Sequence, residues 1–140
     1  MTDTKWTRRR LLGLVPGLAL AGILPRRLFA AALRLTGHPD PRPGIDASKV
    51  LKATQIRHPN AVSVFDQVRE IPQIIDGIRC YCGCGENAGN YSLLSCFEGE
   101  GMAQHCAVCQ GQARLAHRLH REGWSLAGIR TAIDAQFADT

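Results

Sequence analysis

Apolar residues near the C-terminal end recur at intervals of three and four positions, which is the spacing of one face of an α-helix. The clearest stripe consists of Leu126, Ile129, Ile133 and Phe137. Ser125 stands directly before this stripe, at a position that can cap a helix. The segment from Met102 to Glu122 predicts the longest helix, which Gly123 ends. The pattern therefore predicts two consecutive helices at this end of the domain.

Shorter groups of apolar residues, each preceded by a residue that favours a helix start, predict further helical segments upstream. These segments begin at Asp46, Asn60, Pro72 and Ser92. Residues 80–91 are rich in glycine and asparagine and predict a loop. Since no stretch alternates steadily between apolar and polar residues, strands are not expected. We predict an all-α domain, a small bundle of short helices around a cysteine-rich loop.

The first 32 residues differ from the rest and have the composition of an export signal. The basic run Arg8–Arg10 precedes apolar residues 11–25, and small residues follow up to Ala32. The apolar run is shorter than the ~20 residues that span a bilayer comfortably. We therefore predict a signal peptide over residues 1–32, with an uncleaved N-terminal anchor as the alternative.

The same segment resembles a twin-arginine signal. The matching positions are Thr7, Arg8, Arg9 and Leu12. The resemblance implies twin-arginine translocation, a route that exports proteins already folded, often around a cofactor. Cleaved or anchored, the domain is then expected in the periplasm or on the outer face of the cytoplasmic membrane.

A proline-rich tether is predicted between the signal and the domain, over residues 33–45. Prolines at alternate positions, Pro39, Pro41 and Pro43, keep the backbone extended and remove helical hydrogen bonds. The cysteine-rich helical domain is then expected to span residues 46–140.

The net positive charge of the chain comes from the predicted signal segment, residues 1–32. Residues 1–32 hold six of the 17 Lys and Arg residues and one of the 12 acidic residues, so the rest holds 11 of each. The expected domain is therefore neutral and offers no overall basic charge to nucleic acid, which we exclude as a partner.

All six cysteines of the chain lie between positions 80 and 109. They are Cys80, Cys82, Cys84, Cys96, Cys106 and Cys109. The last two stand three positions apart in the predicted long helix, so their thiols share one face. The first three lie in the glycine-containing loop, and the remaining one lies near a helical turn. These three segments can converge, and we predict a single site.

Six neighbouring thiols can bind a soft metal ion, form disulfides or carry out thiol redox chemistry. A structural zinc site needs only four ligands, and the Cys-x-Cys spacing here is tighter than the usual Cys-x2-Cys. Cu(I) prefers thiolates and suits Cys-x-Cys clusters. Folding in the reducing cytoplasm before export would keep the thiols free for metal. We therefore expect a soft metal, Cu(I) ahead of Zn(II), with His105 beside Cys106 as a further candidate ligand.

Two alternatives remain open at this point. Exported proteins enter an oxidising environment. The six cysteines can therefore form three disulfides that staple an interaction domain containing no metal. The Cys106-x-x-Cys109 pair also permits a thiol-redox or electron-transfer accessory protein. No Ser–His–Asp order, phosphate-cradling glycine loop or carboxylate pair stands out, so we expect a binding protein rather than an enzyme.

The cysteine segment resembles the PCYCGC-motif family of exported bacterial proteins, whose function is poorly defined. The resemblance rests on Cys80-Tyr-Cys82-Gly-Cys84, Leu93-Leu94-Ser95-Cys96-Phe97, Cys106-x-x-Cys109, Gly123-Trp124-Ser125 and Ile129-Arg130 with Ile133-Asp134. It implies that the six cysteines act as a set, and it supplies no activity. The expected function is the binding, buffering or delivery of a soft metal, with a membrane or periplasmic redox or metal-handling protein as partner.

Overall fold

The structure is a computed structural model that describes residues 37–83 and 89–139. The predicted signal over residues 1–32, the start of the predicted tether and Cys84 lie outside the described residues. Within the described ranges the protein is helical and contains no strand, which confirms the predicted all-α class. An isolated antiparallel bridge joins Val50 to Glu98.

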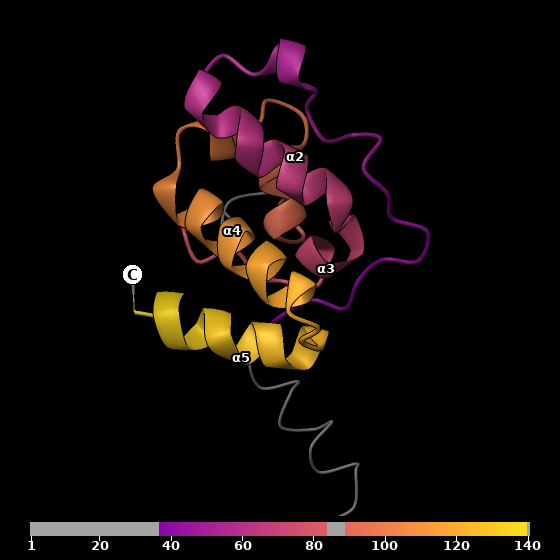
Figure 1. Cartoon of the computed structure of the whole chain (residues 1–140), viewed down its shortest axis with the longest axis vertical. Coiled ribbons are helices and arrows are strands. Elements are labelled where there is room, and N and C mark those ends of the chain that lie inside the picture. Colours follow the sequence, from indigo (N-terminus) through magenta and orange to yellow (C-terminus); the bar gives the residue numbers. More distant parts are fainter. Residues whose placement is uncertain (1–36, 84–88, 140) are drawn as a thin grey trace, which may run out of the picture.

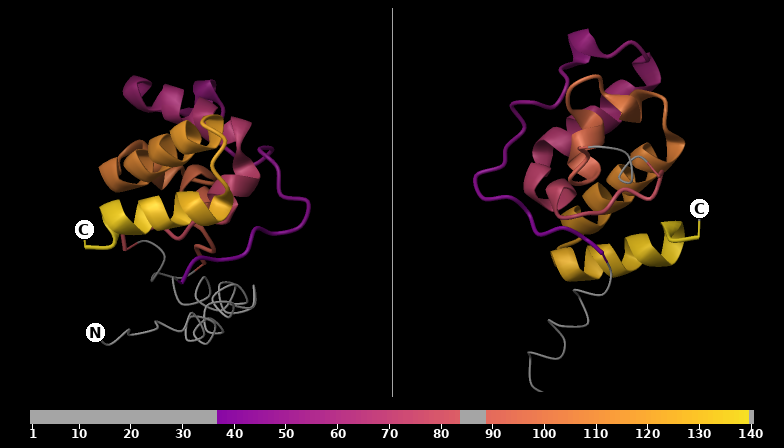
Figure 2. Two further views of the ribbon diagram at one scale, coloured as in Figure 1. Left: turned by 60° about the horizontal axis from the view of Figure 1, so that its bottom comes forward. Right: turned by 180° about the vertical axis from the view of Figure 1, so that it is seen from behind.

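The helices of the described part stack in layers around a central one. They are α2 (Val62–Glu70), α3 (Pro72–Asp76), α4 (Ala107–Arg121) and α5 (Leu126–Phe137). Short 3-10 turns lie between and before them: η2 (Ala53–Gln55), η3 (Pro59–Ala61), η5 (Leu93–Phe97) and η6 (Met102–Gln104). Helix α4 packs against both α2 and α5, and the left view of Figure 2 shows α5, α4 and α2 in that order. The described parts of the segment between α3 and α4, which carry Cys80, Cys82, Cys96 and Cys106, lie against this stack (Figure 1).

Several predicted helix ends are confirmed. Pro72 is the first residue of α3, where its missing N–H costs nothing, and Gly77 follows the last one. The Ser125 side chain accepts a hydrogen bond from the N–H of Gly128 and caps α5. Gly123, with φ +84°, ends the helix before it.

The long helix begins later than the segment from Met102 predicts. Residues 102–104 form η6, and Cys106 has extended backbone angles, so α4 starts at Ala107. The thiol of Cys106 accepts a hydrogen bond from the N–H of Cys109 and takes the role of the helix cap. A cysteine at a capping position gives little sequence signal, because Ser, Thr, Asp and Asn are the usual caps.

The segment predicted to be helical from Asp46 forms no α-helix. Asp46 accepts a hydrogen bond from the N–H of Ser48 instead, and only the short turn η2 follows. The N–H of Leu51 donates to the carbonyl of Phe97 (3.1 Å), so this part of the chain pairs with a distant segment rather than with itself. Burial of Leu51 in the core decides this outcome.

In the part of the chain that the structure describes, the core is an apolar cluster between the layers. Its centre includes a pair of fully buried rings, Phe65 of α2 and Phe97 of η5, whose centroids lie 4.8 Å apart at a steep angle. Among the described residues, no helix is both long and apolar enough to cross a membrane.

The described part of the predicted tether, residues 37–45, runs along one side of the helical stack (Figure 1). Arg42 donates to the buried carboxylate of Asp76 through its backbone N–H and its guanidinium. Arg130 of α5 donates to the carbonyl of Pro39 (2.6 Å) and to that of Gly77 (2.7 Å). This segment therefore joins α3 and α5 and helps to fix the base of the cysteine region.

Candidate metal centre

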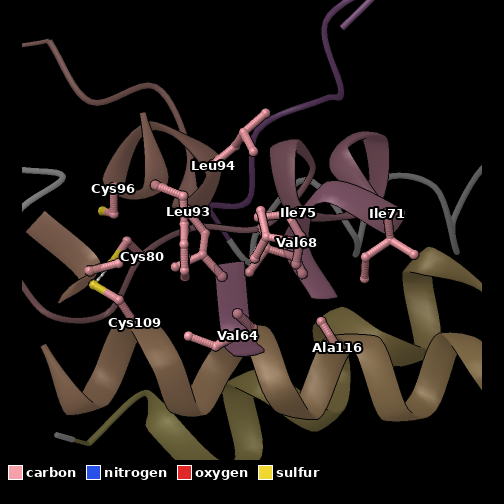
Figure 3. Close-up of a cluster of buried hydrophobic side chains, with 14 of the residues drawn as sticks. Val64, Val68, Ile71, Ile75, Cys80, Leu93, Leu94, Cys96, Cys109 and Ala116 are labelled. Atoms are coloured by element: carbon pink, nitrogen blue, oxygen red, sulfur yellow. Dashed lines mark hydrogen bonds between the residues drawn. The ribbon is translucent and has the colours of Figure 1, made fainter. Parts of the chain in front are cut away.

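Cysteine side chains from three segments of the chain meet beside the apolar core. Their sulfur atoms lie within 4.8 Å of one another, and they belong to Cys80, Cys82, Cys96 and Cys109. Figure 3 shows three of these side chains, those of Cys80, Cys96 and Cys109, gathered at one end of the buried apolar group. We call these four residues the cysteine cluster.

The elements of the fold bring these segments together. Cys109 lies in the first turn of α4, and Cys96 lies in η5. The other two cysteines follow Ile78, whose carbonyl accepts a hydrogen bond from the N–H of Leu93 at 2.7 Å. This bond holds the loop cysteines beside η5, and burial of Ile78 and Leu93 anchors it in the core.

Gln112 fixes the backbone on both sides of Cys80. Its side-chain N–H group donates to the carbonyl of Arg79 (3.0 Å), and its side-chain oxygen accepts from the N–H of Tyr81 (3.1 Å). Gln112 is fully buried. Gln112 follows Cys109 by three positions, so one face of α4 presents both the Cys109 thiol and the amide that positions Cys80. Gln112 was not among the residues predicted from the sequence, although its spacing from Cys109 is the signal that could have identified it.

The sulfur separations suit a shared ion better than a bonded pair. Cys80 and Cys82 are 3.1 Å apart, and each lies 3.4 Å from Cys109. A disulfide bond is about 2.05 Å long, whereas sulfurs around one tetrahedral ion lie about 3.8 Å apart for a metal–sulfur distance near 2.3 Å. The closest sulfur separation, 3.1 Å, and the upper limit of 4.8 Å lie on either side of this value, so small movements of the sulfurs would give a tetrahedral site. Within residues 37–83 and 89–139, no two cysteines are joined by a disulfide bond.

Burial and mutual contact raise the pKa values of two thiols of the cluster, those of Cys80 and Cys109, and keep them neutral when no cation is bound. The pKa of Cys109 is raised by its hydrogen bonds to Cys80 and Cys96 and by burial. For Cys80, the hydrogen bond from Cys109 lowers the pKa, but the contact with Cys96 and burial outweigh it, so the net pKa is also raised. A metal ion must therefore displace protons to bind here, and its positive charge offsets the buried thiolates.

Cys106 lies next to the cluster but outside it. Its half-buried thiol caps α4 and lies 3.4 Å from the backbone nitrogen of Cys109. Together with Cys80 and Cys82, it lines a cleft of about 940 Å³. Cys82 is the half-buried member of the cluster, so this cleft is the side from which the sulfurs are approached.

The structure places His105 away from the cysteine cluster. Its ring is exposed and meets the ring of His58, with centroids 4.1 Å apart. Of the predicted ligands, the structure thus brings four cysteines together, leaves Cys106 as a helix cap beside them and puts His105 on the surface. Cys84 lies outside the described residues.

A second polar group, which sequence reasoning did not identify, supports the loop cysteines. The hydroxyl of Tyr81 donates to the carboxylate of Asp134 on α5 (2.6 Å), and the same oxygen lies 2.6 Å from Nε2 of His38. The Nδ1 atom of His38 accepts from the N–H of Arg79 (2.9 Å), so Nε2 carries the proton and donates to Asp134. His38 and Asp134 are 96 positions apart, and no local pattern predicts their meeting.

These contacts shift the pKa values of both donors. Burial and the hydrogen bond to Asp134 raise the pKa of Tyr81 to about 12, so its hydroxyl stays protonated at neutral pH. Burial is the main cause that lowers the pKa of His38, and it outweighs the contact with Asp134. The Tyr81 side chain, which stands between two members of the cluster, is therefore held by a neutral donor network attached to α5.

Comparison with known proteins gives one finding about family. The model of the family described as "Protein of unknown function with PCYCGC motif" matches residues 46–140. No curated protein and no solved structure matches the chain.

Proposed function

The chain belongs to the family of proteins of unknown function with a PCYCGC motif, and we propose that it binds a soft metal ion at its cysteine cluster. The observation that carries this proposal is the meeting of four thiols from three segments within 4.8 Å. A group of sulfurs with no oxygen or nitrogen ligand among them favours Cu(I) and Zn(II) over hard cations such as Mg²⁺ and Ca²⁺.

The buried position of the cluster supports Cu(I) ahead of Zn(II). A zinc ion held by four thiolates leaves two net negative charges in the site, whereas Cu(I) held by two thiolates leaves one. A buried charge without a partner costs on the order of several kcal/mol. Three members of the cluster, Cys80, Cys96 and Cys109, are buried, so the ion that leaves less charge behind is favoured.

The biological role that we propose is buffering or delivery of this metal outside the cytoplasm. The twin-arginine-like segment supports export, and a folded, metal-loaded protein is a suitable cargo for that route. The cleft beside Cys82 and Cys106 supports exchange, because it gives a partner access to one side of the cluster. A membrane or periplasmic metal-handling protein is the expected partner.

The proposal is tested by competition for metal. Reduced full-length protein is titrated against Cu(I) held by a coloured chelator, and in parallel against Zn²⁺ with a zinc indicator. We expect the protein to withdraw metal from the chelator, the Cys96→Ser and Cys109→Ser variants to lose most of this capacity, and the matched Cys106→Ser control to keep it. Equal capacity in all four proteins would contradict a site at the cysteine cluster.

One observation favours a second candidate function, thiol–disulfide exchange. Cys106 and Cys109 form a Cys-x-x-Cys pair at the start of a helix, the setting in which catalytic thiols occur. The pair would become a disulfide and pass two electrons and two protons to a substrate disulfide. Here Cys106→Ser removes the activity, measured as reduction of insulin by the reduced protein, so this variant separates the two functions.

A further inference from the structure

Two exposed histidines from distant parts of the sequence meet on the surface away from the cysteine cluster. The rings of His58 and His105 lie with centroids 4.1 Å apart and planes at 76°. Both rings face a surface hollow of about 400 Å³. We propose that this histidine pair is a second metal site, which takes a borderline divalent ion such as Ni²⁺, Zn²⁺ or Cu²⁺.

The backbone beneath the pair is fixed before any ion binds. Gln104, which precedes His105, accepts a hydrogen bond from the N–H of Arg57, which precedes His58, at 2.6 Å. Gln104 is only 6% exposed, so this cross-link is shielded from water. The two histidine-bearing segments are thus tied together at the residue before each ring. An ion that binds the rings pays little entropy for ordering the backbone.

Helix α4 and η3 hold the two segments from the other side. The side-chain N–H group of Gln110 in α4 donates to the carbonyls of Ala103 (2.8 Å) and Gln104 (3.2 Å). The carbonyl of His58 accepts from the N–H of Ala61 (2.9 Å) in η3. These hydrogen bonds hold the backbone beside both rings, whereas the imidazole rings themselves are exposed.

The ring separation suits two ligands of one ion. Imidazole nitrogens bind such ions at about 2.0–2.1 Å, so two rings in adjacent coordination positions have centroids about 4.5–5 Å apart. The observed 4.1 Å lies a few tenths of an ångström below this range. Both rings are exposed, so rotation about their side-chain bonds can turn them from the observed edge-to-face arrangement until one nitrogen of each faces the same ion.

The chemistry around the pair selects the class of ion. Among the described residues, no carboxylate or thiol lines the hollow, and the Asn60 amide offers one oxygen there. The side-chain oxygens of Gln104 and Gln110 already accept hydrogen bonds, the latter from Arg114. Hard cations therefore find no oxygen cage, while imidazole suits borderline ions. This site differs in donor atoms from the sulfur-only cluster, and it stands independently of the proposed function.

The test follows the histidine ring signals of untagged, isotope-labelled full-length protein by NMR as Ni²⁺ is added. The protein is first given one equivalent of Zn²⁺, and the titration is repeated without zinc. We expect paramagnetic Ni²⁺ to broaden the rings of His58 and His105 together, before any other histidine ring, in both titrations. Because each ring is observed separately, failure of metal binding at the cysteines leaves this result interpretable.

Variants complete the test. His58→Ala and His105→Gln each leave a single imidazole and are expected to weaken Ni²⁺ binding about 100-fold, since the gain from two linked ligands is lost. His120→Ala removes an exposed ring elsewhere on α4 and should leave the affinity unchanged. Circular dichroism checks that each variant is folded. Broadening shared equally by all histidines, or unchanged affinity in the His58→Ala and His105→Gln proteins, would overturn the proposal.

Discussion

At the scale of single residues, Asp76 binds residues 37–45 to the helical stack through Arg42. Its side chain is fully buried and accepts hydrogen bonds from Arg42 and from the hydroxyl of Ser92 (2.7 Å). The Asp76→Ala substitution leaves both donors without a partner, and we expect it to lower the free energy of unfolding by about 3 kcal/mol. Asp66→Ala, which removes an exposed pair with Arg69, should cost less than about 1 kcal/mol. Urea denaturation of the two variants measures the difference, and equal losses would contradict the role of Asp76.

The same residue predicts how stability depends on pH. Burial raises the pKa of Asp76, but the hydrogen bonds from Arg42 and Ser92 lower it by more, so its net pKa is below the usual value. A carboxylate with a lowered pKa stabilises the fold fully above its unfolded pKa, about 3.9, and this contribution is lost as the pH falls through the folded pKa.

We therefore expect the midpoint urea concentration of reduced, metal-free protein to decrease as the pH is lowered below about 4. In Asp76→Asn the midpoint should be lower at neutral pH and should fall less steeply in acid. Metal-free protein is required because acid also releases metal from thiolates. Parallel curves for the two proteins would assign the acid sensitivity to other carboxylates.

At the scale of elements, the start of η6 depends on Gly101. This residue has φ +62°, and a Cβ atom placed on it would lie 2.4 Å from Cδ1 of the buried Leu51. Gly101→Ala therefore adds a steric clash to backbone strain, and we expect a loss of about 3 kcal/mol. Gly99 has a similar φ of +57° but open space around it. Gly99→Ala should cost only the strain, about 1 kcal/mol, and thermal unfolding of both variants isolates the clash.

The elements also show which features local sequence can predict. Helix ends with specific chemistry, such as Pro72, Ser125 and Gly123, follow from the conformations those residues favour, and the structure has them at those ends. The start of α4 does not follow, because a thiol caps it and because η6 stands before it, beginning after Gly101, whose backbone lies close to Leu51. Tertiary contacts thus decide the boundaries that local preference leaves undefined.

At the scale of the whole molecule, the sequence predicted convergence of the cysteines but not its geometry. Clustering along the chain and the shared helix face of Cys106 and Cys109 indicated one site. In the structure, however, Cys106 turns to cap α4 and His105 lies against His58. Which of the neighbouring thiols join the cysteine cluster depends on how η5 and α4 pack and on the hydrogen bonds from Gln112 to the backbone on both sides of Cys80. Short-range spacing does not contain that information.

The whole molecule also extends beyond the segment that the family model covers. The family model begins at residue 46, whereas residues 38–42 contact α3, α5 and Tyr91. A chain that begins at residue 46 loses the partner of the buried Asp76 carboxylate. We expect its melting temperature to lie roughly 15 °C below that of a chain beginning at residue 37, from a loss of about 3 kcal/mol. Equal melting temperatures would show that residues 37–45 act only as a tether.

The central claim is that the cysteine cluster binds metal, and metal and thiol counting tests it most directly. Full-length protein is purified without oxygen, its metal content is measured by mass spectrometry, and its thiols are titrated after denaturation. We predict about one or more Cu or Zn ions per chain together with all six thiols, and loss of the metal in Cys109→Ser but not in Cys106→Ser. A chain with no metal and no free thiols would contradict the claim and assign the cysteines to disulfides.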